Sequence, residues 1–196
     1  MFRHTRLAFA MFALLTPAAH AQVLPCVPPQ NAGLTPADSA RIADFAQSRT
    51  RGLAQAMLAN SAEDRQAVST IFAAGLAPTD AVPAGQYQCR TIKLGGNLPL
   101  IAYGYFACSI GDDGSIDKTS GSQRFSGTLT PSNGGFFYRG ALHYGDEQPI
   151  VYGADPQRDQ VGCLYEIAGG GRHFVLELPS PPVESVHDLI ELVPAS

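Results

Sequence analysis

Residues 118–144 read KTSGSQRFSGTLTPSNGGFFYRGALHY, and this stretch decides the fold class. Two runs rich in aromatic, aliphatic and hydroxyl side chains flank the turn signal Pro131-Ser132-Asn133-Gly134. Such runs around a short connection that contains glycine are typical of a β-hairpin. The stretch therefore predicts two antiparallel strands, 118–130 and 136–144.

The expected register of this hairpin opposes small residues to rings. It places Gly127 opposite Tyr138, and Phe125 opposite Gly140. Large residues facing glycines are how rings fit into a packed sheet, so this face is predicted to be the core. A shift by one residue would mix the two faces.

The other face of the hairpin is polar and is expected to point outward, toward solvent or the N-terminal helices. Its members are Lys118, Ser120, Ser122, Arg124, Ser126 and Thr128 on one strand, with Phe137, Arg139, Ala141 and His143 on the other. Ser122 would face His143, with Asp146 and Glu147 just beyond, which suggests a hydrolase triad. Against this hypothesis, the Gly-x-Ser-x-Gly elbow is missing and a flat strand offers no oxyanion hole.

After residue 85 the chain consists of short runs separated by turn residues, which is typical of an all-β barrel or sandwich. The eight predicted strands are Tyr87–Leu94, Leu100–Ile110, Lys118–Thr130, Phe136–Tyr144, Pro149–Tyr152, Val161–Ala168, Arg172–Leu178 and His187–Val193. Eight consecutive antiparallel strands favour an up-and-down, barrel-like domain over residues 86–196, of lipocalin or avidin type. Its interior would hold side chains or one small ligand. The chain has no tryptophan, so the Gly-x-Trp motif of true lipocalins is missing.

The N-terminal part predicts export and a helical hairpin. Residues 1–21 combine a basic start, a short apolar run and Ala19-His20-Ala21, the pattern of a cleaved signal peptide. An extended leader, 22–34, follows. Thr35-Pro36 and Ser61 start the two helices of a hairpin over 35–75, and a linker over 76–85 leads into the barrel. The fold is thus mainly β, with a short helical hairpin packed on an eight-stranded barrel.

The charge balance argues against two classes of partner. Removal of the signal peptide leaves 11 basic and 17 acidic residues, a net charge of −6. Without a basic stripe, binding to nucleic acid or to an anionic membrane is not expected. No later segment is apolar enough to span a membrane.

Four cysteines follow the expected cleavage site, and an even count in an exported chain predicts two disulfides with three possible connectivities. A turn at Asn97-Leu98 would place Cys89 opposite Cys108. Cross-strand neighbours are close enough to bond, so Cys89–Cys108 is predicted. Cys26 and Cys163 then remain to join the leader to a later strand.

The remaining polar residues suggest weaker sites. Asp146, Glu147, Asp155 and Asp159 are oxygen donors, but their spacing matches no calcium loop and no metal is expected. Arg124, Arg139, Arg158 and Arg172 form either an anion-binding patch or surface ion pairs of little weight. His173 and His187 belong to no cluster of metal ligands.

A string of motifs resembles one exported bacterial family, domain of unknown function 4893. These motifs are Tyr87 to Gly95 (YQCRTIKLG), Lys118 to Arg124 with Gly127 to Leu129, Gly145-Asp146-Glu147, Arg158 to Gly162, Glu184-Ser185 and Glu191 to Pro194. The resemblance implies no activity. It implies that Cys89 and Cys108 belong to the family pattern, whereas Cys26, Cys163 and His143 do not. The matching polar residues, implied to form one network, are Lys118, Gln123, Arg124, Asp146, Glu147, Arg158 and Asp159.

Together these features favour a periplasmic or secreted protein that binds a small molecule or an envelope protein, with protease inhibition as a variant of binding. A hydrolase using Ser122 and His143, or a purely structural envelope component, remain the alternatives. No cofactor is expected.

Overall fold

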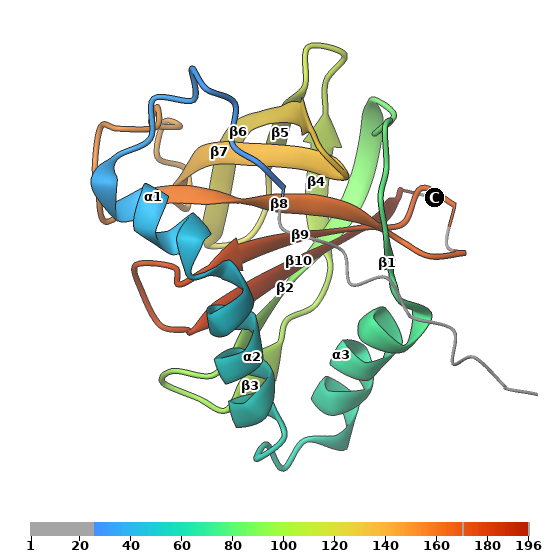
Figure 1. The fold of residues 1–196 in the computed structure, drawn as a ribbon. Coiled ribbons are helices and arrows are strands. Elements are labelled where there is room, and N and C mark those ends of the chain that lie inside the picture. Colours follow the sequence, from blue (N-terminus) through green and yellow to red (C-terminus); the bar gives the residue numbers. More distant parts are fainter. Residues whose placement is uncertain (1–25, 170, 196) are drawn as a thin grey trace, which may run out of the picture.

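A computed structural model of the chain describes residues 26–169 and 171–195 (Figure 1). Three helices come first: α1 (Pro36–Ala43), α2 (Phe45–Ala56) and α3 (Ala62–Ala74). The strands are β1 (Leu76–Ala77), β2 (Gly85–Leu94), β3 (Leu100–Ala102), β4 (Phe106–Ile110), β5 (Ser115–Lys118), β6 (Gln123–Ser132), β7 (Gly135–Tyr144), β8 (Asp159–Ile167), β9 (Phe174–Pro179) and β10 (His187–Pro194). The predicted signal peptide lies outside the described residues.

Eight antiparallel strands close into a barrel, which confirms the predicted fold class. Their order is β2, β4, β5, β6, β7, β8, β9 and β10, and β10 pairs with β2 to complete the circle. The short strands β1 and β3 add to β8 and β2. None of the helices in the described part of the chain is long and apolar enough to cross a membrane.

Three predicted strands differ from those observed, although the barrel has the predicted eight. The predicted run Leu100–Ile110 is two strands, β3 and β4, separated by residues 103–105. The predicted run Pro149–Tyr152 is a loop, held by a hydrogen bond from the Tyr152 hydroxyl to Asp38. The predicted run 118–130 is instead two strands, β5 and β6, because the chain bends between them at Gly121, which has a φ of +87°. Glycine is the residue that adopts this backbone conformation readily.

The register of the β6–β7 hairpin differs from the prediction by two residues. Phe125 pairs with Leu142, and Gly127 with Gly140, because the strands continue to a two-residue Asn133-Gly134 turn. A shift by two leaves each residue on its predicted face. The glycines still make room for a ring, since a Cβ on Gly127 or Gly140 would overlap Tyr138.

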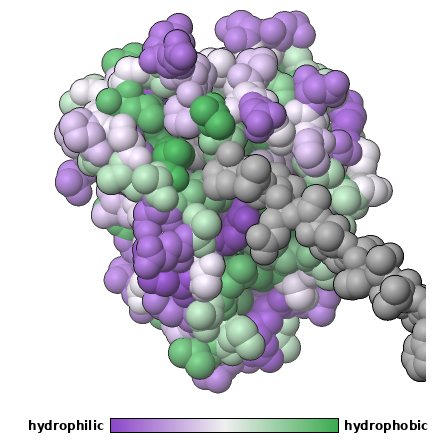
Figure 2. All heavy atoms as spheres, in the orientation of Figure 1, coloured by the Kyte–Doolittle hydropathy of each residue, from purple (hydrophilic) through white to green (hydrophobic). Residues whose placement is uncertain are grey.

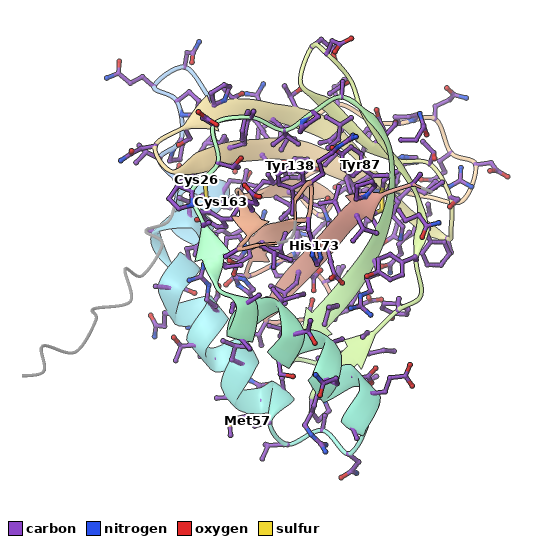
Figure 3. The ribbon with its side chains drawn as sticks, turned by 90° about the vertical axis from the view of Figure 1, so that its right-hand side faces the viewer. Cys26, Met57, Tyr87, Tyr138, Cys163 and His173 are labelled. Carbon is purple, nitrogen blue, oxygen red and sulfur yellow. A yellow bond between two sulfur atoms is a disulfide. The ribbon has the colours of Figure 1, made fainter. Side chains whose placement is uncertain are left out.

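Both predicted disulfides are present. Cys26–Cys163 closes a separation of 137 residues and ties the leader to β8, as Figure 3 shows. Cys89–Cys108 joins β2 and β4 inside the barrel. Its predicted register is wrong, because Cys108 pairs with Tyr87 and Cys89 with Phe106. Diagonal neighbours on one face of a sheet remain within reach of each other.

The helices cover one outer face of the barrel (Figure 1). The first predicted helix is broken at Asp44 into α1 and α2, and Thr35 and Ser61 cap α1 and α3 as expected. Gly52 allows a close approach, since a Cβ there would lie 3.0 Å from the Leu94 Cβ and 3.1 Å from the His187 Cβ. Hydrophobic surface is exposed over the lower part of the molecule, where α2 and α3 lie (Figure 2).

Candidate functional site

The interior of the barrel is largely filled by side chains. Its core includes Tyr87 and Tyr138, both labelled in Figure 3, with Phe125, Phe174 and Leu176. What remains at one end is a cavity of about 30 Å³. Its polar lining residues are Thr91, Lys93, Lys118, Gln123, Gln157, Arg158, Gln160 and Asp188. We call this end the barrel mouth.

Strand geometry turns both lysines of the mouth inward. Side chains alternate along a strand, so Lys93 shares the face of Tyr87 and Cys89, which are core residues of the interior. Lys118 pairs with Phe125, another interior residue. The outward orientation predicted for Lys118 is therefore wrong, because β5 is separated from β6 by the bend at 119–122.

Lys93 is a paired lysine. Its Nζ lies 2.5 Å from Glu184 Oε2, and Asp188 stands opposite on β10. Burial alone would lower the pKa of Lys93, but the charges of Asp188 and Glu184 outweigh it and raise that pKa above 10.5. Burial also raises the pKa of Asp188, although Lys93 and a hydrogen bond from Ser185 (2.5 Å) oppose the rise.

Lys118 has no carboxylate within ion-pair distance among the described residues. It is 6% exposed, and its Nζ lies 4.5 Å from the centre of the Phe106 ring. Burial, followed by repulsion from Lys93 and Arg124, lowers the pKa of the Lys118 ammonium group to about 8. Desolvation and neighbouring like charge both disfavour a buried ammonium group. Within the described part of the chain, the mouth thus contains a buried lysine whose charge contacts an aromatic ring and no carboxylate.

A short loop, residues 180–186, covers the mouth. Pro181, Pro182 and Val183 line the cavity, and the loop turns through positive φ angles at Ser180 and Glu184. Glu184 holds the loop in place, because its carboxylate accepts hydrogen bonds from Lys93 and, at 3.3 Å, from Gln123.

The other residues expected to form one polar network are divided between two places. Arg124 pairs with Asp146 at 3.1 Å and Arg158 with Glu147 at 2.6 Å, both beside the mouth. Asp159 lies away from them, against α1 and the loop at Gly153, where its Oδ1 accepts a 2.8 Å hydrogen bond.

Arg139 is also remote from the mouth. Its guanidinium donates to the Ala32 carbonyl of the leader and stacks 5.1 Å from the centre of the Tyr152 ring. It therefore holds the leader and the loop before β8 rather than the mouth.

The predicted facing of Ser122 and His143 is wrong. Arg124 pairs with His143, and Ser122 lies in the bend, where its carbonyl accepts from the Gly145 amide. His143 is 4% exposed, and its Nδ1 has no hydrogen-bond partner in the described part of the chain. The two-residue register shift separates the proposed serine from its base.

The structure contains a different Ser-His-Glu array, which was not predicted from the sequence. Ser48 Oγ lies 2.9 Å from His187 Nδ1, and His187 Nε2 lies 2.9 Å from Glu177 Oε2. Arg49 donates two further bonds to Glu177, of 2.7 and 2.6 Å. We call these four residues the Glu177 cluster.

Three of the four side chains in the Glu177 cluster are sealed from solvent, and Arg49 reaches the surface with 21% of its side chain exposed. Ser48, Glu177 and His187 are fully buried between α2 and strands β9 and β10. Burial alone would raise the pKa of Glu177, but the hydrogen bond from His187 and the charge of Arg49 lower it. A catalytic serine needs access to substrate, so this array serves to hold α2 on the barrel. Nothing in the spacing of residues 48, 177 and 187 indicated their contact.

The molecule is therefore a closed, mostly filled eight-stranded barrel with an outer helical layer and a lysine-lined mouth. The chain belongs to the family described as Domain of unknown function (DUF4893), whose model matches residues 31–192. This confirms the resemblance seen in the sequence. No match was found among curated proteins or among solved structures.

Proposed function

We propose that this is an exported binding protein whose barrel mouth takes a small anionic ligand, specifically a carboxylate group. The observation that carries the proposal is Lys118, a buried cation that lines a cavity and has no carboxylate partner among residues 26–169 and 171–195. A buried charge without a partner is unfavourable, so an anion that enters the mouth gains by neutralising it.

The surroundings of Lys118 favour an anion over a neutral ligand. Lys93 and Arg124 both act on Lys118 by repulsion, and Gln123 adds an amide donor to the lining. The other cations at the mouth each have a carboxylate already, Glu184 for Lys93 and Asp146 for Arg124. Lys118 is therefore the position at which an added carboxylate has most effect.

The size of the cavity limits what it accepts. About 30 Å³ corresponds to roughly two water molecules, so a carboxylate group fits and a bulky ligand does not. Any larger part of a ligand would extend past Pro181–Val183.

Two features support export. The N-terminal sequence has the pattern of a signal peptide, and the chain forms two disulfides. Disulfides persist in oxidising compartments and are rare in the cytosol.

Titration calorimetry with propionate and propionamide tests the proposal. Propionate is expected to bind and propionamide is not, and Lys118→Met is expected to weaken propionate binding at least about tenfold. Because the ligand requires protonated Lys118, its affinity should fall as the pH rises through about 8. Arg51→Gln removes an exposed charge on α2 and should bind propionate normally. Equal binding of acid and amide, or full binding by Lys118→Met, would refute an anion site.

A further inference from the structure

The chain has only two lysines, and both lie in the barrel mouth. The other eleven basic residues are all arginine. Lys93 and Lys118 are 7% and 6% exposed, so no lysine serves as a solvated surface charge. Arginine remains protonated in proteins, whereas a buried lysine loses its proton readily and then becomes a nucleophile. The mouth is thus the one place in the chain where side-chain amines occur.

The two lysines are in different states. Lys93 forms an ion pair with Glu184, so its amine is protonated and is not nucleophilic. Lys118 instead faces an aromatic ring and two cations, Lys93 and Arg124. A lysine that is desolvated, or that lies beside another cation, is the activated form that attacks carbonyl groups.

We propose that Lys118 is a nucleophilic amine that condenses with the carbonyl group of a small oxo acid, so that the ligand is held as an imine. The inference rests on the proposed function, since it places the carbonyl-bearing acid in the same mouth.

The reaction balances without a further reagent. The neutral Lys118 nitrogen bonds to the carbonyl carbon and gives a carbinolamine. The nitrogen then loses its second hydrogen, the former carbonyl oxygen leaves as water, and a C=N bond remains. No oxidant or reductant is involved, and hydrolysis returns the free amine and the oxo acid.

The charged groups around the mouth favour an acid over a plain aldehyde. They are Lys93 from β2, Arg158 before β8, Glu184 from the covering loop and Asp188 from β10, with the Arg124–Asp146 pair and Glu147 beside them. The imine removes the positive charge of Lys118, and the carboxylate of the ligand then faces the cavity-lining cations Lys93 and Arg158. At pH 7, the lowered pKa gives Lys118 on the order of a hundredfold more free amine than an ordinary lysine.

Reductive trapping tests the inference directly. The mature, disulfide-intact protein is incubated with pyruvate and sodium cyanoborohydride, and adducts are located by intact mass and peptide mapping. A Lys118 adduct is expected, forming at least about tenfold faster than an adduct at Lys93. Peptide mapping separates it from any adduct at the N-terminal amine, whose ordinary pKa is also about 8. Lys118→Arg keeps the charge and should abolish the adduct, whereas Lys93→Arg should retain it.

A competition needs no variant and so does not depend on folding. Propionate, which lacks a carbonyl group, should slow trapping of wild-type Lys118 by pyruvate. No adduct at Lys118, or equal labelling of Lys118 and Lys93, would overturn the inference. If propionate still binds in a Lys118-dependent way, the anion site stands without the imine. If Lys118 is trapped but propionate neither binds nor competes, the amine assignment stands and the anion site fails.

Discussion

Two buried polar clusters, one between α2 and the wall of the barrel and the other in the barrel mouth, differ in whether their charges are paired. In the Glu177 cluster, a fully buried carboxylate accepts from Arg49 and His187, and His187 contacts Ser48. At the mouth, Lys118 is 6% exposed and has no acidic partner among the described residues. Glu177 and His187 are covered by α2, whereas Lys118 borders a cavity.

The comparison shows how burial alone fails to identify a functional site. Partners stabilise the charged form of Glu177 and lower its pKa, while the surroundings of Lys118 destabilise its charged form. A satisfied cluster fixes the packing of its elements. An unsatisfied one retains free energy that a ligand can recover.

The largest expected effect comes from breaking the satisfied cluster. Arg49→Met would leave Glu177 buried without its two-bond partner, and should lower the free energy of unfolding by about 3–5 kcal/mol. Urea denaturation measures this loss. Arg51→Met on the same helix removes an exposed pair and should cost far less. Similar losses of stability in the two variants would show that the buried Arg49–Glu177 pair contributes no more than the exposed Arg51–Asp44 pair.

The second-largest effect on stability is expected from removing the unpaired charge of Lys118 at the mouth. Lys118→Met should stabilise the protein at pH 7, by about 1–2 kcal/mol once solvent screening at the cavity is allowed for, because the wild type must hold an unpaired, partly desolvated ammonium group. The folded-state pKa is about 8 against 10.5 for an unfolded lysine. The penalty is therefore complete below pH 8 and disappears as the pH rises toward 10.5. Denaturation without small carboxylates in the buffer, repeated across this range, checks both sign and window. A pH-independent difference, or a less stable variant, would contradict the description of Lys118.

A smaller effect tests how tightly the Glu177 cluster is satisfied. Ser48→Ala leaves His187 Nδ1 without its partner and should cost about 1 kcal/mol. Ser69→Ala on the exposed face of α3 is the matched control and should change little. An equal, negligible effect at both serines would show that the Ser48–His187 contact does not contribute.

The smallest effect concerns the loop over the mouth. Glu184→Gln removes one of the two carboxylates near Lys93 and should strengthen propionate binding about threefold, with a loss of stability limited to about 1 kcal/mol because Asp188 remains opposite Lys93. Glu63→Gln, on exposed α3, removes the same charge elsewhere and should leave the affinity unchanged. Weaker binding in Glu184→Gln would mean that Glu184 orders the site rather than competing with the ligand.

Much of the fold could be predicted because it depends on patterns that are local in sequence. The alternation of apolar and polar residues, together with the turn residues, predicted the barrel. Each face of the β6–β7 hairpin was predicted correctly, although the predicted register was wrong by two residues. A shift by two residues leaves each side chain on the same face of the sheet, but it changes which residue lies opposite. The disulfide Cys89–Cys108 tolerated the same error because diagonal positions remain close.

The candidate site depends on a bend and on contacts between distant segments, which no local sequence pattern indicates. The bend at Gly121 turns Lys118 into the barrel, and a continuous strand would have placed it outside. The Glu177 cluster combines a helix with two strands more than a hundred residues away, so no local pattern announces it. Family motifs did include Lys118 and Gln123, but they also included Asp159, which serves the packing of α1.

The central claim, that Lys118 is an unpaired and weakly basic amine, is tested most directly by NMR titration of the protein labelled with ¹³C at lysine. Only two lysine signals exist, which makes their assignment through Lys93→Arg straightforward. We expect the Lys118 signal to titrate near pH 8 and the Lys93 signal to titrate above 10.5. Titration of both lysines together, above 10, would show that Lys118 is solvated or paired and would contradict the proposed site.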